Sequence, residues 1–316
     1  MNTKRTENNT PPRASQALRA LRTTALALCT TLAACAPGDD VTVEPGEAQT
    51  LNLTGKIVPM EAVATRAGTQ GEYGIGAVVV IYFADGVTDN PPYTGYALTA
   101  DGAMTLVDGF SAPTYRDKTQ PVYLYAYGLV EETLNTKKSY LPIQAVDTYR
   151  DNDSKSLQLE FHIAVARVTL NFTNPGKGTF NPQLLFKQRT DDSGANMWID
   201  PKTVNDGPKL NEDSYTAGIE YGYSNYNHII IPDVFPGQSF PAGTPIIAYK
   251  LKDDAGAETT HNVYCHTDIT LEAGYQYTFN VTIDGTSNYI ADNPIIAPLF
   301  PGNGEDGEHV WGSDGQ

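Results

Sequence analysis

The chain has 316 residues, which is enough for two domains with a core each. Its formal net charge of −16 speaks against nucleic acid as a partner, because an acidic surface repels phosphate backbones. Tyrosine, glycine and proline are abundant, a composition that favours β-strands joined by turns over helices. The three cysteines are Cys29, Cys35 and Cys265. The first two fall in a leader, so a disulfide within the mature body is excluded.

Residues 1–34 have the pattern of a lipoprotein signal peptide. A basic stretch precedes an apolar run at 23–34, and this run is too short for a membrane-spanning helix. It ends in Leu-Ala-Ala-Cys, which resembles the bacterial lipobox. This predicts that Cys35 is lipidated, becomes the mature N-terminus and anchors the precursor in the outer membrane. The alternative is an ordinary signal peptide with an incidental cysteine. Asp39 and Asp40 resemble the acidic tags that direct lipoproteins to the cell surface in some Gram-negative anaerobes.

Residues 35–66 are interpreted as a propeptide or tether that contains one strand. The stretch LNLTGKIV alternates apolar and polar residues, so Leu51, Leu53 and Ile57 are expected on one face of a half-buried strand. While attached, this strand is predicted to lie against the first domain. After its release, a strand from a neighbouring subunit is predicted to take its place.

A single arginine ends this segment. Arg66 stands between small residues, and neither lysine nor arginine follows it until Arg116. The glycine-rich stretch after it favours an accessible bond, so a trypsin-like, arginine-specific protease is expected to cut between Arg66 and Ala67. The alternative is a flexible linker with an incidental arginine.

The rest of the chain predicts short strands with turns between them, and no segment shows a convincing helical period. Strands are expected at 77–83, at 93–99 and 103–110 as a hairpin, at 120–130, and at 182–188, 227–233 and 244–251. The stretches 259–271 and 275–283 are expected to form a closing hairpin. The alternating run at 155–172 is too long for one simple strand, so it is predicted to finish one domain, start the next, or do both. Together these patterns predict an all-β fold of sandwiches.

Residues with catalytic or metal-binding chemistry are few. His261, Cys265 and His266 form the nearest approach to a metal cluster, but a strand would point the last away from the first two, and zinc needs three or four converging ligands. We therefore expect no metal, no cofactor and no enzymatic activity, since hydrolase, metalloprotease and nucleotide-binding motifs are absent from the sequence. The tyrosines of YAYG and YGYSNY are candidates for sugar stacking, although alternating tyrosines more often pair across a sheet.

The order of these features resembles the fimbrillin family, the subunits of lipoprotein-derived pili in Gram-negative anaerobes. The matching stretches are LAAC, ATRAG, VYLYAYG, FHIAVARVTLNF and LEAGYQYTFNVTI. The resemblance implies two tandem transthyretin-like β-sandwiches, export to the cell surface, cleavage after Arg66 and assembly with other pilus subunits by strand exchange. The implied divisions are the signal peptide at 1–34, the propeptide at 35–66, sandwiches at 67–173 and 174–285, and a C-terminal appendage at 286–316.

One feature departs from the family pattern. Stalk subunits carry a C-terminal donor strand, for which 287–300 is the best candidate here, but Pro294 and Pro298 interrupt it. Proline cannot donate to a strand ladder, so a tip or accessory role stays open beside the stalk. The rival function is an anchored glycan-binding lipoprotein that is never cut or polymerised. A hydrolase with an unrecognised site is a third possibility.

Overall fold

The structure of the protein is a computed structural model that describes residues 49–58, 77–84, 93–99, 102–112, 114–115, 122–134, 137–149, 156–174, 178–190, 196–199, 209–285, 288–289 and 293–299. Strands and the turns between them make up these residues, and the helix among them is one short 3-10 helix, η1 (Glu212–Ser214). The predicted all-β fold is confirmed. No helix in the described part of the chain has the length and apolarity needed to cross a membrane.

The first half forms a seven-stranded sheet that curls back on itself. In spatial order its strands are β2 (Asn52–Ile57), β9 (Ser156–Ile163), β8 (Lys137–Tyr149), β7 (Val122–Leu134), β3 (Ala77–Ala84), β4 (Tyr93–Leu98) and β5 (Met104–Leu106). The end strands meet where Thr54 bridges Ala103 and the Gly55 N–H donates to the Gly102 carbonyl at 3.0 Å. The pairing of β4 with β5 confirms the hairpin expected around Gly102.

The first hydrophobic core lies inside this curled sheet. Its members include Val79, Ile81, Leu124, Ile143 and Phe161, which point inward at alternate positions of their strands. The opposite face carries a separate aromatic cluster in which Tyr82, Tyr127 and Trp198 pack together. Period-two alternation along β3 and β7 thus builds two apolar layers from one sheet.

The second half forms two further sheets around its own core. One contains β15 (His228–Val234), β10 (Ala166–Thr173), β20 (Tyr275–Thr282) and β22 (Ile295–Pro298). The other contains β14 (Ile219–Glu220), β11 (Thr179–Leu184), β17 (Pro245–Lys252), β18 (Glu258–Tyr264) and β21 (Asn288–Tyr289). Short two-stranded sheets pair β1 (Gln49–Thr50) with β6 (Thr114–Tyr115), β12 (Trp198–Ile199) with β13 (Lys209–Leu210), and β16 (Gln238–Phe240) with β19 (Ile269–Leu271).

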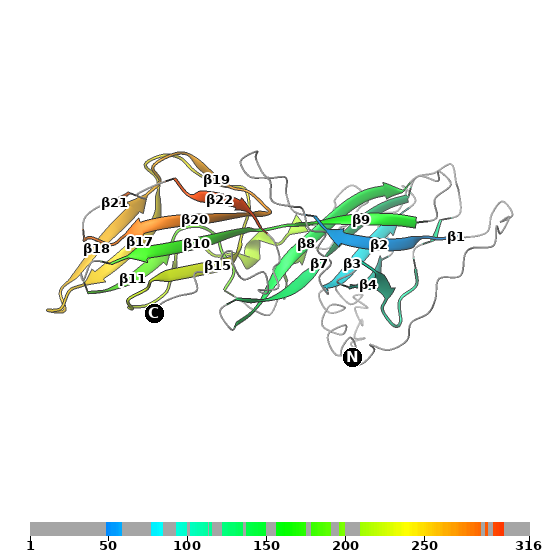
Figure 1. The fold of residues 1–316 in the computed structure, drawn as a ribbon, viewed down its shortest axis with the longest axis horizontal. Helices are drawn as coiled ribbons and strands as arrows, with labels where there is room; N and C mark the ends of the chain where they lie inside the picture. Colours follow the sequence, from blue (N-terminus) through cyan, green and yellow to red (C-terminus); the bar gives the residue numbers. More distant parts are fainter. Residues whose placement is uncertain are drawn as a thin grey trace, which may run out of the picture.

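One continuous run of chain links the two cores. Figure 1 shows β9 leading directly into β10 along the long axis of the molecule. Strand β9 belongs to the first sheet and β10 to the second half, as the long alternating run predicted. Val165 packs in the first core and Ala166 in the second, so the boundary between the two cores lies between these neighbouring residues. The division into domains at 173/174 stays a prediction.

The expected closing hairpin of 259–271 with 275–283 is wrong. Strand β19 pairs with β16, whereas β20 pairs in parallel with β10 and antiparallel with β22. The physical reason lies in the connecting turn, where the Gly274 N–H donates to the Val165 carbonyl at 2.8 Å. This bond fixes the turn beside the start of β10, so β20 begins next to that strand and not next to β19.

A buried polar cluster ties the second half to the first core. Tyr215 packs among first-core residues and edge-on against Phe235. Its hydroxyl donates to Asp233 Oδ1 at 2.8 Å, and Arg189 Nε lies 3.4 Å from Asp233 Oδ2. Burial raises the pKa of Tyr215 far above its ordinary value, and the Asp233 charge raises it further. The hydroxyl therefore stays protonated and acts as a donor to the buried carboxylate.

We predict that Tyr215→Phe lowers the free energy of unfolding by about 1–3 kcal/mol, because a buried carboxylate loses one of its donors. Urea denaturation of the purified protein measures this change. Tyr223→Phe is the matched control, since Tyr223 is exposed and its change should stay within about 0.5 kcal/mol. Equal stability of the two variants would contradict the role assigned to Tyr215.

Candidate functional site

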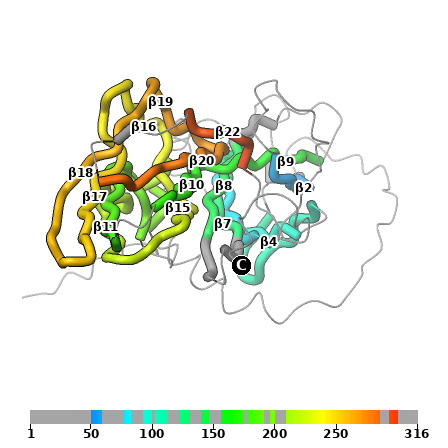
Figure 2. The backbone as a smooth tube through the Cα atoms, turned by 60° about the vertical axis from the view of Figure 1, so that its left-hand side comes forward, coloured from blue at the N-terminus to red at the C-terminus, as the bar shows by residue number. Residues whose placement is uncertain are grey.

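Strand β2 is the element on which the sequence and the structure converge. Its side chains alternate between core and solvent. Leu51, directly before the strand, and Leu53 and Ile57 within it are 1%, 6% and 3% exposed. All three belong to the first core. Figure 2 shows β2 lying alongside β9. In the order of the sheet, β9, β8 and β7 stand between β2 and β3, the next strand of this sheet in sequence. A segment placed in the propeptide thus completes the core of the first half.

Backbone pairing holds β2 on both sides. It runs parallel to β9 in continuous register from Asn52 beside Ser156 to Ile57 beside Phe161. The Val58 N–H extends this ladder to the Phe161 carbonyl at 2.8 Å. On the other side only the contact of residues 54–55 with 102–103 reaches β5. Within the described residues, β2 is therefore the strand that closes the sheet.

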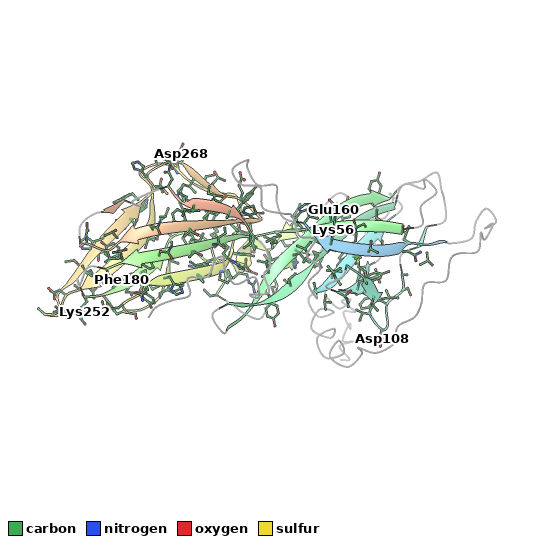
Figure 3. All side chains as sticks on the ribbon, in the orientation of Figure 1. Lys56, Asp108, Glu160, Phe180, Lys252 and Asp268 are labelled. Atoms are coloured by element: carbon green, nitrogen blue, oxygen red, sulfur yellow. The ribbon has the colours of Figure 1, made fainter. Side chains whose placement is uncertain are left out.

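The side chains of β2 supply most of its attachment energy. Burying three aliphatic side chains contributes roughly 4–9 kcal/mol before the entropy of ordering is subtracted. On the outer face Lys56 Nζ lies 3.0 Å from Glu160 Oε1, and the two residues are neighbours in Figure 3. This pair is solvent-accessible, so its contribution is about 0–1 kcal/mol.

Gly55 occupies an inward position between Leu53 and Ile57. A Cβ at this position would lie 3.0 Å from Phe161 Cε2, 3.1 Å from Met104 Sδ and 3.2 Å from Leu98 Cδ1. These three side chains come from β9, β5 and β4, so the ends of the sheet converge at this glycine. Gly102 faces it with φ +85°, and a Cβ there would meet the Gly55 carbonyl at 2.8 Å. Both glycines are required by the close approach of β2 and the β4–β5 hairpin.

A second terminal strand, β22, is held much less firmly. It pairs antiparallel with β20 at the edge of its sheet, and Figure 2 shows the two side by side. Ile295 and Ile296 are 62% and 56% exposed. The next residue after the strand, Leu299, is buried in the first core, and its N–H donates to the Gly274 carbonyl at 2.7 Å.

The predicted site residues fall into two groups. Leu51, Leu53 and Ile57 are brought together in one core, although their displacement stays a prediction. Cys35, Arg66 and Ala67 lie outside the described residues, so lipidation and cleavage also stay predictions.

The side chains of His261 and Cys265, which the sequence offered as candidate metal ligands, pack within the protein. The His261 ring stacks on Tyr249 at 5.2 Å, and burial raises the pKa of the Cys265 thiol to about 11. No group of three or more His, Cys, Asp or Glu side chains suited to a metal ion occurs among the residues that the structure describes.

The tyrosines that were candidates for sugar stacking differ in exposure. Tyr127 is buried, with its ring between Tyr82 and Trp198. Tyr223 is exposed, and its hydroxyl donates to Glu258 while Lys252 lies 5.8 Å from the ring centroid. The ring of Tyr127 is thus covered by other aromatic side chains, whereas Tyr223 lies on the surface and interacts with Glu258 and Lys252.

Sequence reasoning missed two residues of the first core and the close approach at one glycine beside it. Leu299 and Tyr215 come from the second half of the chain, and neither stands in a periodic pattern that points to a distant core. Gly55 carried a usable signal, because a glycine on the inward face of a strand indicates a close approach.

Comparisons with known proteins found distant likeness in structure. No protein-family model matches the chain, and no curated protein sequence matches it. A candidate cell adhesion protein of Bacteroides uniformis has 13% identity and a TM-score of 0.39, covering 72% of this chain and 91% of its own. One from Bacteroides ovatus has 14% identity and a TM-score of 0.40, covering 80% and 97%. The C-terminally truncated tip fimbrial protein Mfa3 of Porphyromonas gingivalis has 10% identity and a TM-score of 0.34, covering 71% and 92%. Likeness at this level assigns no function to the chain.

We predict that Leu53→Ala lowers the free energy of unfolding of the uncut protein by about 2–5 kcal/mol, because it leaves a cavity in the first core. Asn52→Ala is the matched control on the same strand, since Asn52 points to solvent and its change should be within about 0.5 kcal/mol. Denaturant unfolding measures both. A Leu53→Ala protein as stable as the control would show that β2 contributes nothing to the core.

Proposed function

We propose that the protein is the precursor of a pilus subunit that is matured by cleavage after Arg66 and assembled by strand exchange. The observation that carries the proposal is the position of β2. This strand precedes Arg66 in sequence, closes the first sheet and, together with Leu51 directly before it, supplies three core side chains. An element that is both structurally required and separated from the body by one predicted cleavage site has the properties of a removable plug.

The exchange has a physical basis in the state that β2 leaves behind. Loss of β2 uncovers the apolar side chains that contact it and the pairing groups of β9 on that side. Exposed strand edges of this kind recruit another strand. A strand from a neighbouring subunit recovers both the ladder and the buried apolar area, which is the recognition mode called β-augmentation.

The C-terminal segment is the chain's own candidate for the donated strand. Ile295 and Ile296 are largely exposed where β22 now lies, so these two side chains give up little buried surface on leaving β20, whereas Leu299 directly after the strand leaves a buried position. Pro298 sits within the strand and cannot donate a backbone hydrogen bond. The donor would therefore be held in the new position mainly by its side chains.

The remaining parts of the proposal concern location and partners. Lipidation of Cys35 retains the precursor at the outer membrane until cleavage, and the mature protein becomes part of a cell-surface fimbria that contributes to adhesion. Its partners are other pilus subunits and an arginine-specific protease. We propose a structural and not an enzymatic role.

We predict that Arg66→Ala abolishes assembly. Purified precursor treated with an arginine-specific protease should acquire Ala67 as its N-terminus and form denaturant-resistant ladders on a gel, alone or with a donor subunit. The Arg66→Ala protein should remain monomeric because β2 stays tethered, whereas Arg116→Ala, the control at the next arginine, should assemble like the wild type. If the Arg66→Ala protein assembles as readily as the wild type, cleavage at Arg66 is not the step that triggers assembly.

We predict that Cys35→Ser abolishes lipid labelling and membrane retention of the precursor, since serine has no thiol to carry the thioether. Metabolic labelling with a fatty acid and fractionation of cells measure both properties. Cys29→Ser is the matched control within the same leader and should be labelled normally. A Cys35→Ser protein that remains labelled and membrane-bound would refute the anchor.

A further inference from the structure

We infer that the groove filled by β2 selects the incoming strand by size at one position, and that only glycine or alanine is accepted opposite Phe161, Met104 and Leu98. This inference rests on the proposed strand exchange and specifies its partner. The incoming segment is an extended strand with aliphatic residues two positions before and two positions after the small residue.

The geometry around Gly55 carries the inference. The three atoms nearest to a Cβ added at this glycine, at 3.0–3.2 Å, belong to side chains of three different strands, so no single movement makes room. One methyl group already meets the Phe161 ring at 3.0 Å, as well as the flexible ends of Met104 and Leu98 at 3.1 and 3.2 Å, so each of the three must shift by a few tenths of an ångström to admit alanine. A branched side chain presses further on the Phe161 ring, which is itself fully buried, and overpacking of this kind is destabilising.

The flanking positions set the register of the incoming strand. Leu53 and Ile57 are buried on either side of Gly55, and side chains on one face of a strand recur at every second residue. A shift by one residue would direct the polar face into the core. The small residue must therefore meet the Gly55 position while aliphatic residues meet the positions of Leu53 and Ile57.

Charge on the outer face adds a weaker preference. Lys56 faces Glu160 across the ladder, so an acidic residue directly after the small one would meet a like charge in the same orientation. Because this pair is solvent-accessible, the electrostatic effect is small beside the steric one.

The chain contains a segment with the required spacing. In β22 and the residue after it, Ile295, Ala297 and Leu299 stand at alternate positions, with the small residue between two aliphatic ones. This segment meets the size rule with alanine in the central position.

The test uses protein cut by an arginine-specific protease and labelled synthetic peptides that span residues 49–58. After gentle heating to release the resident segment, capture of each peptide is measured by fluorescence anisotropy. The wild-type peptide and the Thr54→Val peptide, whose change points to solvent, should bind equally well. The Gly55→Val peptide should bind about tenfold more weakly or worse. The cut Met104→Ala protein should regain part of the binding of the Gly55→Val peptide, because one of the three crowding side chains is removed while Phe161 and Leu98 remain.

The outcomes separate the size rule from the exchange itself. If the wild-type and Gly55→Val peptides bind equally, the size rule is overturned and the exchange stands. If Gly55→Val and Thr54→Val weaken binding alike, the effect is general to the peptide and the size rule is also overturned. If the wild-type peptide fails to bind cut protein, the exchange fails and the size rule falls with it.

Discussion

Closure of the first sheet by β2 is the constraint on which the rest of the first half depends. The strands from β9 to β5 form a continuous ladder, but their inward side chains enclose a core only when β2 lies between the two ends. Hydrophobic burial is non-directional, whereas a ladder needs a partner at every edge. β2 satisfies both demands at once, since its inward residues fill the core and its backbone pairs with β9. A segment with this double role cannot leave without replacement.

The same core also receives the C-terminal part of the chain. Leu299 and Tyr215 pack in the cluster that contains Leu51, Leu53 and Ile57. Val165 stands at the changeover between the cores, and its carbonyl accepts from Gly274 while the Gly274 carbonyl accepts from Leu299. The ends of the described chain are thus linked through one apolar cluster and one short chain of backbone hydrogen bonds. Residues that contact one another in this way are expected to respond together to substitution.

The sequence specified local features well and distant pairings poorly. Alternation at Leu51, Leu53 and Ile57 predicted both the strand and its inward face, and the strand patterns at 93–99 and 103–110 predicted the β4–β5 hairpin. The parallel pairing of β2 with β9 could not be predicted, because it depends on the path of all the strands between them. The turn before β20 is compatible with the hairpin that the sequence predicted. The Gly274 N–H, however, donates to the Val165 carbonyl and places the start of β20 beside β10. Tyr215 stands outside the expected strands and Leu299 in the expected C-terminal appendage, so only the fold shows that they reach the first core.

Strands β2 and β22 differ in how deeply their side chains are buried, and this difference favours the proposed exchange. β2 hides its aliphatic side chains, whereas Ile295 and Ile296 of β22 remain largely in water and Leu299 alone is well buried beside them. Full burial of an isoleucine is worth about 1.5–3 kcal/mol relative to leaving it exposed. A segment that moves from the edge of β20 into a groove as deep as that of β2, with Ile295 and Leu299 inward, therefore gains the burial of Ile295, while Leu299 exchanges one buried position for another. The central small residue then decides which strands can make the move, because the groove is narrowest where Phe161, Met104 and Leu98 converge on Gly55.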